Sequence, residues 1–113
     1  MAVAFTDIFY QLDAKIMLLK IYFEKAEDDA LFGLLDTLLI FLRRQKGISA
    51  QQKKSYMNLS RLVKKAYKLK IDIALKQDGP LKAKWQQLLL NIQQAQPVAA
   101  KDWLMDQVKG LYV

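Results

Sequence analysis

The chain of 113 residues contains neither cysteine nor histidine. Without cysteine, disulfides, thiol nucleophiles and zinc–thiolate sites are excluded. Without histidine, the chain lacks the commonest general base near neutral pH and the usual imidazole ligand of metals. It also has no glycine-rich phosphate loop and no nucleophile motif. We therefore expect a protein that is not an enzyme and that holds neither a metal nor a cofactor.

Long apolar runs are also missing. The most apolar segment, "ALFGLLDTLLIFL", has thirteen residues and is interrupted by Asp36, which makes it too short to cross a bilayer. Asp36 itself is expected at the edge of a buried helix face, in a salt bridge or partly exposed, rather than in a catalytic role. The first residues, "MAVAFTDIFYQ", lack the basic leader and apolar stretch of a signal peptide. We expect a soluble cytoplasmic protein with no membrane partner.

Only two prolines and four glycines occur, and apolar residues recur at helical spacing almost throughout the chain. This pattern predicts an all-α domain of about five helices arranged in antiparallel hairpins. It does not assign residues 71–79. We expect a single domain over residues 1–113, consisting of a helical hairpin at 5–46, a long basic helix at 49–71, and C-terminal helices at 80–95 and 98–111.

The first predicted helix is apolar on two sides. Seven residues fall within a sector of about 100° and form the main buried face: Phe5, Ile8, Phe9, Leu12, Ile16, Leu19 and Phe23. On the opposite side lies a second stripe, formed by Tyr10, Ala14, Met17 and Ile21. A helix with two apolar faces sits between other helices or at the open end of a stack. Either the other helices of this chain cover the second stripe, or it contacts a second copy or a missing upstream helix pair.

The second predicted helix has charge signals at both ends. Its first turn contains Glu27, Asp28 and Asp29, and its last turn contains basic residues up to Lys46, as the helix dipole favours. Gly47 is expected to stop it. Because the connection to the first helix is short, the two must form an antiparallel hairpin. Its predicted buried face consists of Leu31, Leu34, Leu35, Leu38, Leu39 and Leu42.

The later breaks also have local signals. Ser49, followed three residues later by Gln52, fits a capping box at the start of the third helix. Pro80 suits the first position of the fourth helix. In that helix Trp85, Leu88 and Ile92 recur at core spacing, and the fifth helix presents Trp103, Leu104 and Val108 in the same way.

Basic charge is concentrated in one part of the chain. Residues 1–36 carry three lysines against seven acids, residues 37–71 carry ten cations and no acid, and residues 72–113 carry five cations against four acids. In the third helix, which includes "SRLVKKAYKLK" (60–70), six cations project more than about 110° away from Leu59 on the apolar side, and Lys70 is the one cation on the apolar side itself. The predicted basic patch consists of Arg43, Arg44, Lys53, Lys54, Arg61, Lys64, Lys65 and Lys68.

Two interpretations of this patch remain open. Its cations would suit the phosphates of a nucleic acid bound without sequence readout. However, five of the six on the third helix are lysines, and no aromatic side chain lies among them to stack a base. A solvated lysine-rich helix face accounts for the same pattern.

Most of the chain resembles the C-terminal part of uncharacterised bacterial proteins built from tetratricopeptide-like helical repeats. The resemblance rests on residues 15–70, from "KIMLLKIYFEKAEDDALFGLLDTLLIFLRR" onward, and on "KDWLMDQV" (101–108). Ala30 matches the small residue of the second repeat helix, but the small residue of the first is absent and no 34-residue period occurs. The resemblance implies the end module of an α-solenoid, a scaffold for protein partners, and it transfers no catalytic residues.

These observations favour a non-enzymatic protein–protein interaction or structural module, the terminal part of a helical-repeat scaffold. Its expected partners are another protein, of unknown identity, and a second copy bound through the first helix. The alternative is non-specific nucleic-acid binding through residues 43–70.

Overall fold

In the computed structural model, the chain is described over residues 4–75 and 79–112, with side chains from residue 8 onward. These ranges contain five α-helices, one terminal 3-10 turn and no strand, so the all-α prediction is confirmed. Phe5, expected in the buried face of the first helix, lies outside the described side chains. The elements are α1 (Ala4–Glu24), α2 (Asp28–Arg44), α3 (Ala50–Ala74), α4 (Leu81–Gln94), α5 (Lys101–Lys109) and η1 (Gly110–Tyr112).

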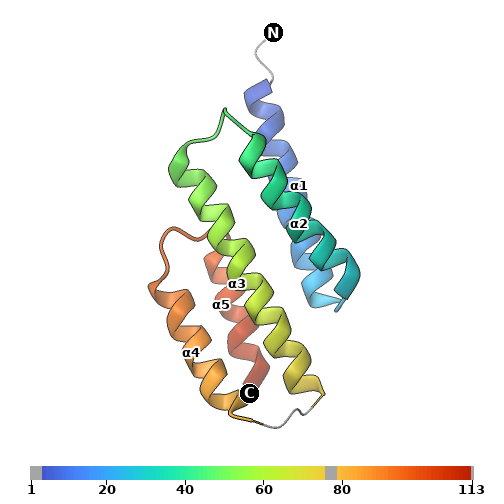
Figure 1. The fold of residues 1–113 in the computed structure, drawn as a ribbon, viewed down its shortest axis with the longest axis vertical. Coiled ribbons are helices and arrows are strands. Elements are labelled where there is room, and N and C mark those ends of the chain that lie inside the picture. Colours follow the sequence, from blue (N-terminus) through green and yellow to red (C-terminus); the bar gives the residue numbers. More distant parts are fainter. Residues whose placement is uncertain (1–3, 76–78, 113) are drawn as a thin grey trace. The chain divides into compact units, whose positions relative to one another are not determined.

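The chain divides into two compact units, Met1–Ser49 and Ala50–Val113. The first unit is the hairpin of α1 and α2 (Figure 1). Its turn is built without glycine: Ala26 adopts a left-handed conformation with φ of 57°. Its amide donates to the Phe23 carbonyl at 3.3 Å and the Glu27 amide donates to the Tyr22 carbonyl at 2.9 Å. This is the Schellman arrangement, which closes the last turn of α1 and reverses the chain.

The buried residues of the first unit follow the predicted faces. In α1, Leu12, Leu19 and Phe23 are fully buried, while Ile8, Phe9 and Ile16 are half-buried. Across the hairpin, the Lys15 Nζ lies 4.5 Å from the centre of the Phe41 ring, within the range of a cation–π contact. In α2 the buried leucines are Leu31, Leu35, Leu38 and Leu42, whereas Leu34 and Leu39 are only half-buried.

The ends of α2 agree with the charge signals, but its stop differs from the prediction. Asp28 and Asp29 occupy the first turn, and Arg43 and Arg44 the last. The helix ends at Arg44 because the next residue is extended, so Lys46 and Gly47 both lie beyond it. Gly47 instead leaves room for a neighbour, since a Cβ there would lie 3.0 Å from the Ile8 Cδ1.

The second unit is a three-helix arrangement in which α3, α4 and α5 contact one another (Figure 1). Helix α4 runs antiparallel to α3, and α5 runs antiparallel to α4. The Trp85 Nε1 donates a hydrogen bond of 2.6 Å to the Val108 carbonyl, joining α4 to the end of α5. The buried side chains are Leu59, Ser60, Leu62, Val63, Ala66, Tyr67 and Leu69 of α3, Leu88 and Ile92 of α4, and Leu104 and Val108 of α5.

Two helix starts in this unit lie later than predicted. Pro80 is the N-cap of α4 rather than its first helical residue, and its carbonyl accepts the Lys84 amide at 2.9 Å. The fifth helix begins at Lys101 rather than near residue 98, because Ala100 is left-handed, with φ of 51°, and breaks the helical geometry there. Helix α3 begins at Ala50, directly after Ser49, and continues to Ala74.

None of the helices in residues 4–75 and 79–112 combines the length and apolar character that crossing a bilayer requires.

Candidate functional site

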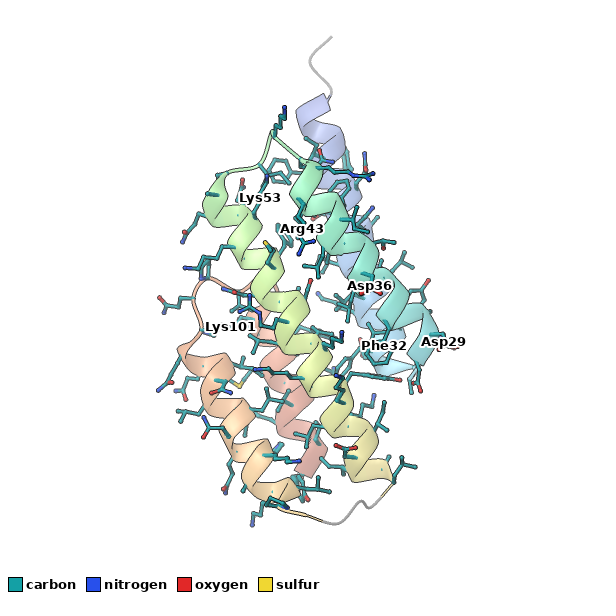
Figure 2. The ribbon with its side chains drawn as sticks, in the orientation of Figure 1. Asp29, Phe32, Asp36, Arg43, Lys53 and Lys101 are labelled. Atoms are coloured by element: carbon teal, nitrogen blue, oxygen red, sulfur yellow. The ribbon has the colours of Figure 1, made fainter. Side chains whose placement is uncertain are left out.

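Most of the α3 cations in the predicted basic patch are exposed. Lys54, Arg61, Lys64, Lys65 and Lys68 are exposed, and Lys53 is half-buried. The other two members of the predicted basic patch, Arg43 and Arg44, are exposed in the last turn of α2 and belong to the first unit (Figure 2).

A groove lies between α3 and α4, within the second unit. It consists of two adjoining hollows with volumes of about 340 and 380 Å³, and both are lined by Lys65 and Asn91. We call these together the α3–α4 groove. The first hollow is also lined by Lys68, Leu69, Asp72, Lys84, Gln87 and Leu88, and the second by Asn58, Arg61, Leu62, Gln94, Ala95 and Gln96.

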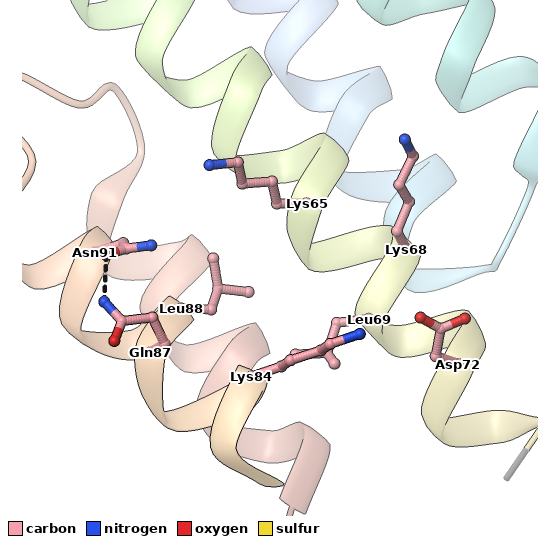
Figure 3. A pocket seen from close by; sticks show the side chains of 8 residues that line it. All are labelled: Lys65, Lys68, Leu69, Asp72, Lys84, Gln87, Leu88 and Asn91. Carbon is pink, nitrogen blue, oxygen red and sulfur yellow. Dashed lines mark hydrogen bonds between the residues drawn. The ribbon is translucent and has the colours of Figure 1, made fainter. Parts of the chain in front are cut away.

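The groove has an apolar floor between polar rims. Leu62, Leu69 and Leu88 are each less than a tenth exposed, so they form the base rather than the edges. Figure 3 shows Lys65 reaching from α3 toward α4, and Lys84 reaching from α4 toward α3. Four cations, five side-chain amides and a single carboxylate line the groove. Its charge is therefore positive by three, and its polar groups are mainly hydrogen-bond donors.

Hydrogen bonds fix the end of the groove where α4 turns into α5. The Asn58 Nδ2 donates to the Pro97 carbonyl at 2.9 Å, and the Ala99 amide donates to the Ser55 carbonyl at 3.2 Å. The Lys101 Nζ (labelled in Figure 2) donates to the carbonyls of Gln93 and Ala95 at 2.9 and 3.0 Å. These contacts hold the segment after α4 against α3, which places Ala95 and Gln96 at the lip of the groove.

The sequence located only half of this site. Arg61, Lys65 and Lys68 belong to the predicted patch, whereas α4 contributes Lys84 and a row of amides that the sequence interpretation did not single out. A signal existed: Lys84, Gln87, Asn91 and Gln94 recur at helical spacing on one side of the fourth helix. No local pattern places this row opposite the third helix.

The second stripe of α1 lies on the surface. Tyr10 is 69% exposed and Met17 is 64% exposed, and both Ala14 and Ile21 are also exposed. Leu18, beside the stripe, is exposed as well. The apolar stripe therefore presents large side chains to solvent over three turns of helix.

Three observations concern polar side chains outside the groove. Asp36 is exposed on α2 (Figure 2). The hydroxyl of the buried Ser60 donates to the Tyr56 carbonyl at 3.0 Å, a bond within its own helix. Over residues 4–75 and 79–112, no three acidic residues lie close enough together to hold a metal ion.

Comparison of the chain with family models, with curated proteins and with solved structures finds no match. The candidate site therefore rests on its own geometry.

Proposed function

We propose that this chain is a non-enzymatic, cytoplasmic protein-interaction module that binds a protein partner in the α3–α4 groove. The observation that carries the proposal is the make-up of the groove, an apolar floor between rims of cations and amides. Protein interfaces combine a desolvated apolar centre with a polar rim in the same way. A segment laid along two antiparallel helices would contact both the floor and the rims.

An interaction module agrees with the chemistry of the chain better than an enzyme does. The groove holds one carboxylate, Asp72, and the chain has no histidine or cysteine to serve as its partner in acid–base or nucleophilic chemistry. Its lysines and amides are groups that bind and orient a ligand through hydrogen bonds and charge.

The proposal extends to the kind of protein from which such a module comes. A terminal unit of a helical-repeat scaffold would carry an apolar face that a neighbouring helix covers in the assembled form. The exposed second stripe of α1 is such a face, with Tyr10 and Met17 its most exposed members. We propose that a second copy covers it. A two-fold axis between Ala14 and Met17 would set Tyr10 of one copy against Ile21 of the other, so the stripe is complementary to itself.

Non-specific nucleic-acid binding is a second candidate, favoured by the five exposed cations of α3. Two features of the groove weigh against it: no aromatic side chain lines it, and Asp72 would repel a phosphate at one end. Affinity carried by about six phosphate contacts should fall by orders of magnitude between ~50 and ~200 mM salt. Absence of binding to duplex and single-stranded DNA at the lower salt concentration would eliminate this candidate.

Two neighbouring glutamines provide the test of the main proposal. Gln86 and Gln87 are both exposed on α4, but only Gln87 lines the groove. A photo-crosslinking amino acid at position 87 should capture a partner in cells, whereas one at position 86 should not. The captured protein is then purified and its affinity is measured. Gln87→Trp should weaken binding by about tenfold or more, as expected for a blocked interface centre, and Gln86→Trp should leave it unchanged.

If Gln86→Trp and Gln87→Trp changed the affinity for the purified partner equally, the proposal would be overturned, because the partner would not bind in the groove. Crosslinking at position 87 in cells to a protein that does not bind the chain once purified would count against the proposal as well.

A further inference from the structure

The rims of the α3–α4 groove carry charge of nearly one sign. Arg61, Lys65 and Lys68 project from α3 and Lys84 from α4, while Asp72 is the only carboxylate. Charge complementarity between two surfaces selects partners and speeds their association. A ligand of this groove should therefore carry several negative charges.

The amides reinforce this preference. The Gln87 Nε2 donates to the Asn91 Oδ1 at 2.9 Å, which uses one of the two lone pairs of that oxygen (Figure 3). The Asn91 Nδ2 points away from Gln87, toward the side of the groove formed by α3. Because Asn91 lines both hollows, the middle of the groove presents a donor from α4 and a cation from α3. Carboxylate oxygens, which only accept hydrogen bonds, match this arrangement.

The apolar floor of the groove indicates that its ligand carries apolar groups as well as negative charge. Leu69 and Leu88 are each 5% exposed, and they line the first hollow together with Lys65 and Lys84. Inorganic anions and phosphodiester backbones have no apolar groups to cover these leucines. A protein segment that carries apolar side chains as well as carboxylates satisfies both parts of the groove.

The length of the groove sets the size of the ligand. Arg61 and Asp72 are eleven residues apart on α3, which corresponds to about 16 Å along the helix axis. Three turns of a bound helix have the same length. Carboxylates of the ligand would face Arg61, Lys65 and Lys68, which follow one another at intervals of four and three residues, as neighbours on one helix face do.

We propose that the α3–α4 groove binds an acidic amphipathic segment of a protein partner. Its apolar side chains lie on the leucine floor and its carboxylates face the cations of the rims. The inference rests on the proposed function, and it adds the chemical class of the partner. Exposed ion pairs are individually weak, so several of them must act together with the apolar lining of the groove, and the cations of the rims supply the selectivity and the rate of association.

Two adjacent lysines allow a matched test. Lys64 and Lys65 are both exposed on α3, but only Lys65 lines the groove. Lys64→Glu and Lys65→Glu change the net charge of the chain equally. The probe is a fluorescent peptide of about fourteen residues, roughly 21 Å long as a helix, with leucines on one helix face and glutamates on the others. Three comparison probes are the same peptide with lysine for glutamate, a permuted peptide without an apolar face, and a duplex DNA.

The full chain should bind the leucine–glutamate peptide and should bind the permuted and lysine peptides at least about tenfold more weakly. Lys65→Glu should weaken the leucine–glutamate peptide by about tenfold or more, Lys64→Glu by less than about threefold, and Lys65→Glu should bind the lysine peptide better than wild type does. On addition of the peptide, the side-chain amide NMR signals of Gln87 and Asn91 should shift, while those of Gln11 and Gln86 should not. Circular dichroism establishes that both variants remain folded.

Several results would overturn the inference. The first is absence of binding to the leucine–glutamate peptide, and the second is equally tight binding of the permuted peptide. The third is an equal loss of peptide affinity from Lys64→Glu and Lys65→Glu. The fourth is tighter binding of the DNA than of the peptide, with DNA affinity lost equally in both variants. A purified partner that responds to Gln87→Trp but not to Lys65→Glu would leave the proposed function standing and remove the acidic ligand alone.

Discussion

The indole of Trp85 on α4 donates a 2.6 Å hydrogen bond to the backbone carbonyl of Val108, near the end of α5. The Trp85 ring also lies 5.4 Å from the ring of Tyr112 in the following 3-10 turn, at a tilt of 48°. One half-buried side chain therefore ties the C-terminal residues to α4 through both a polar and an aromatic contact. Because α4 forms one wall of the α3–α4 groove, these two contacts help to hold that wall of the candidate site in place.

Trp85→Phe is expected to destabilise the protein by about 1–3 kcal/mol, since it removes the only side-chain donor of Trp85 and leaves the Val108 carbonyl without that partner. Urea unfolding followed by far-ultraviolet circular dichroism measures the change in the free energy of unfolding. Tyr112→Phe serves as the control, because it keeps the ring that faces Trp85, and should change the free energy by less than about 0.5 kcal/mol. A Trp85→Phe protein as stable as wild type would show that the bond contributes nothing.

Ala26→Gly is expected to stabilise the protein. Ala26 ends α1 in a left-handed conformation, φ 57°, which costs a residue with a Cβ about 1–2 kcal/mol and costs glycine almost nothing. After the greater entropy that glycine has in the unfolded chain is subtracted, a gain of about 0.5–1 kcal/mol remains. Thermal unfolding should show a higher Tm.

The matched control applies the same change inside a helix. Ala14 is an exposed residue in the middle of α1, and Ala14→Gly should cost about 1 kcal/mol. If both substitutions lowered the Tm, the left-handed geometry of Ala26 would not be a source of strain.

The local features of this fold were readable from the sequence. Helical spacing located all five helices, and the leucines predicted to line α2 include the four that are buried, Leu31, Leu35, Leu38 and Leu42. Features without a local signal were missed. Ala26 and Ala100 occupy left-handed positions for which glycine is the usual marker. Tyr67 is fully buried although it projects about 80° from Leu59, at the edge of the predicted apolar side.

The candidate site was only half predictable for a related reason. The cations of α3 form a local pattern, so the sequence identified Arg61, Lys65 and Lys68. The groove exists because α4 sets Lys84 and Asn91 opposite them, and helix pairing depends on contacts between residues far apart in the chain. A sequence pattern assigns faces to each helix, but it does not state which faces meet.

Lys101→Met is expected to loosen the end of α4. The Lys101 Nζ donates to the carbonyls of Gln93 and Ala95, at the end of the helix where a positive charge is favoured. Loss of both bonds should lower the free energy of unfolding by about 1–2 kcal/mol, while Lys101→Arg should retain most of it. Because Ala95 lines the groove, amide hydrogen exchange near residues 93–96 should accelerate in the methionine variant. Unchanged exchange in this segment would contradict the anchoring role.

Met17→Glu is expected to abolish self-association of the chain. Met17 is 64% exposed in the middle of the second stripe of α1 and, in the two-fold arrangement proposed above, lies against Ala14 of a second copy. A carboxylate there would be buried without a partner, which is strongly unfavourable. Sedimentation velocity of the wild type over roughly 1 µM to 1 mM, concentrations that span weak to moderate affinities, should show a sedimentation coefficient that rises with concentration. The Met17→Glu variant should sediment as a monomer throughout.

Gln11→Glu is the control that shows whether a loss of self-association comes from the stripe itself or from the added negative charge. Gln11 is exposed on α1 next to Tyr10 but is not a member of the stripe, and its substitution adds the same negative charge as Met17→Glu. It should sediment as wild type does. If wild type is monomeric over the whole range, the stripe does not mediate self-association. If both variants dissociate alike, long-range repulsion between the copies, rather than burial of Met17, would account for the loss.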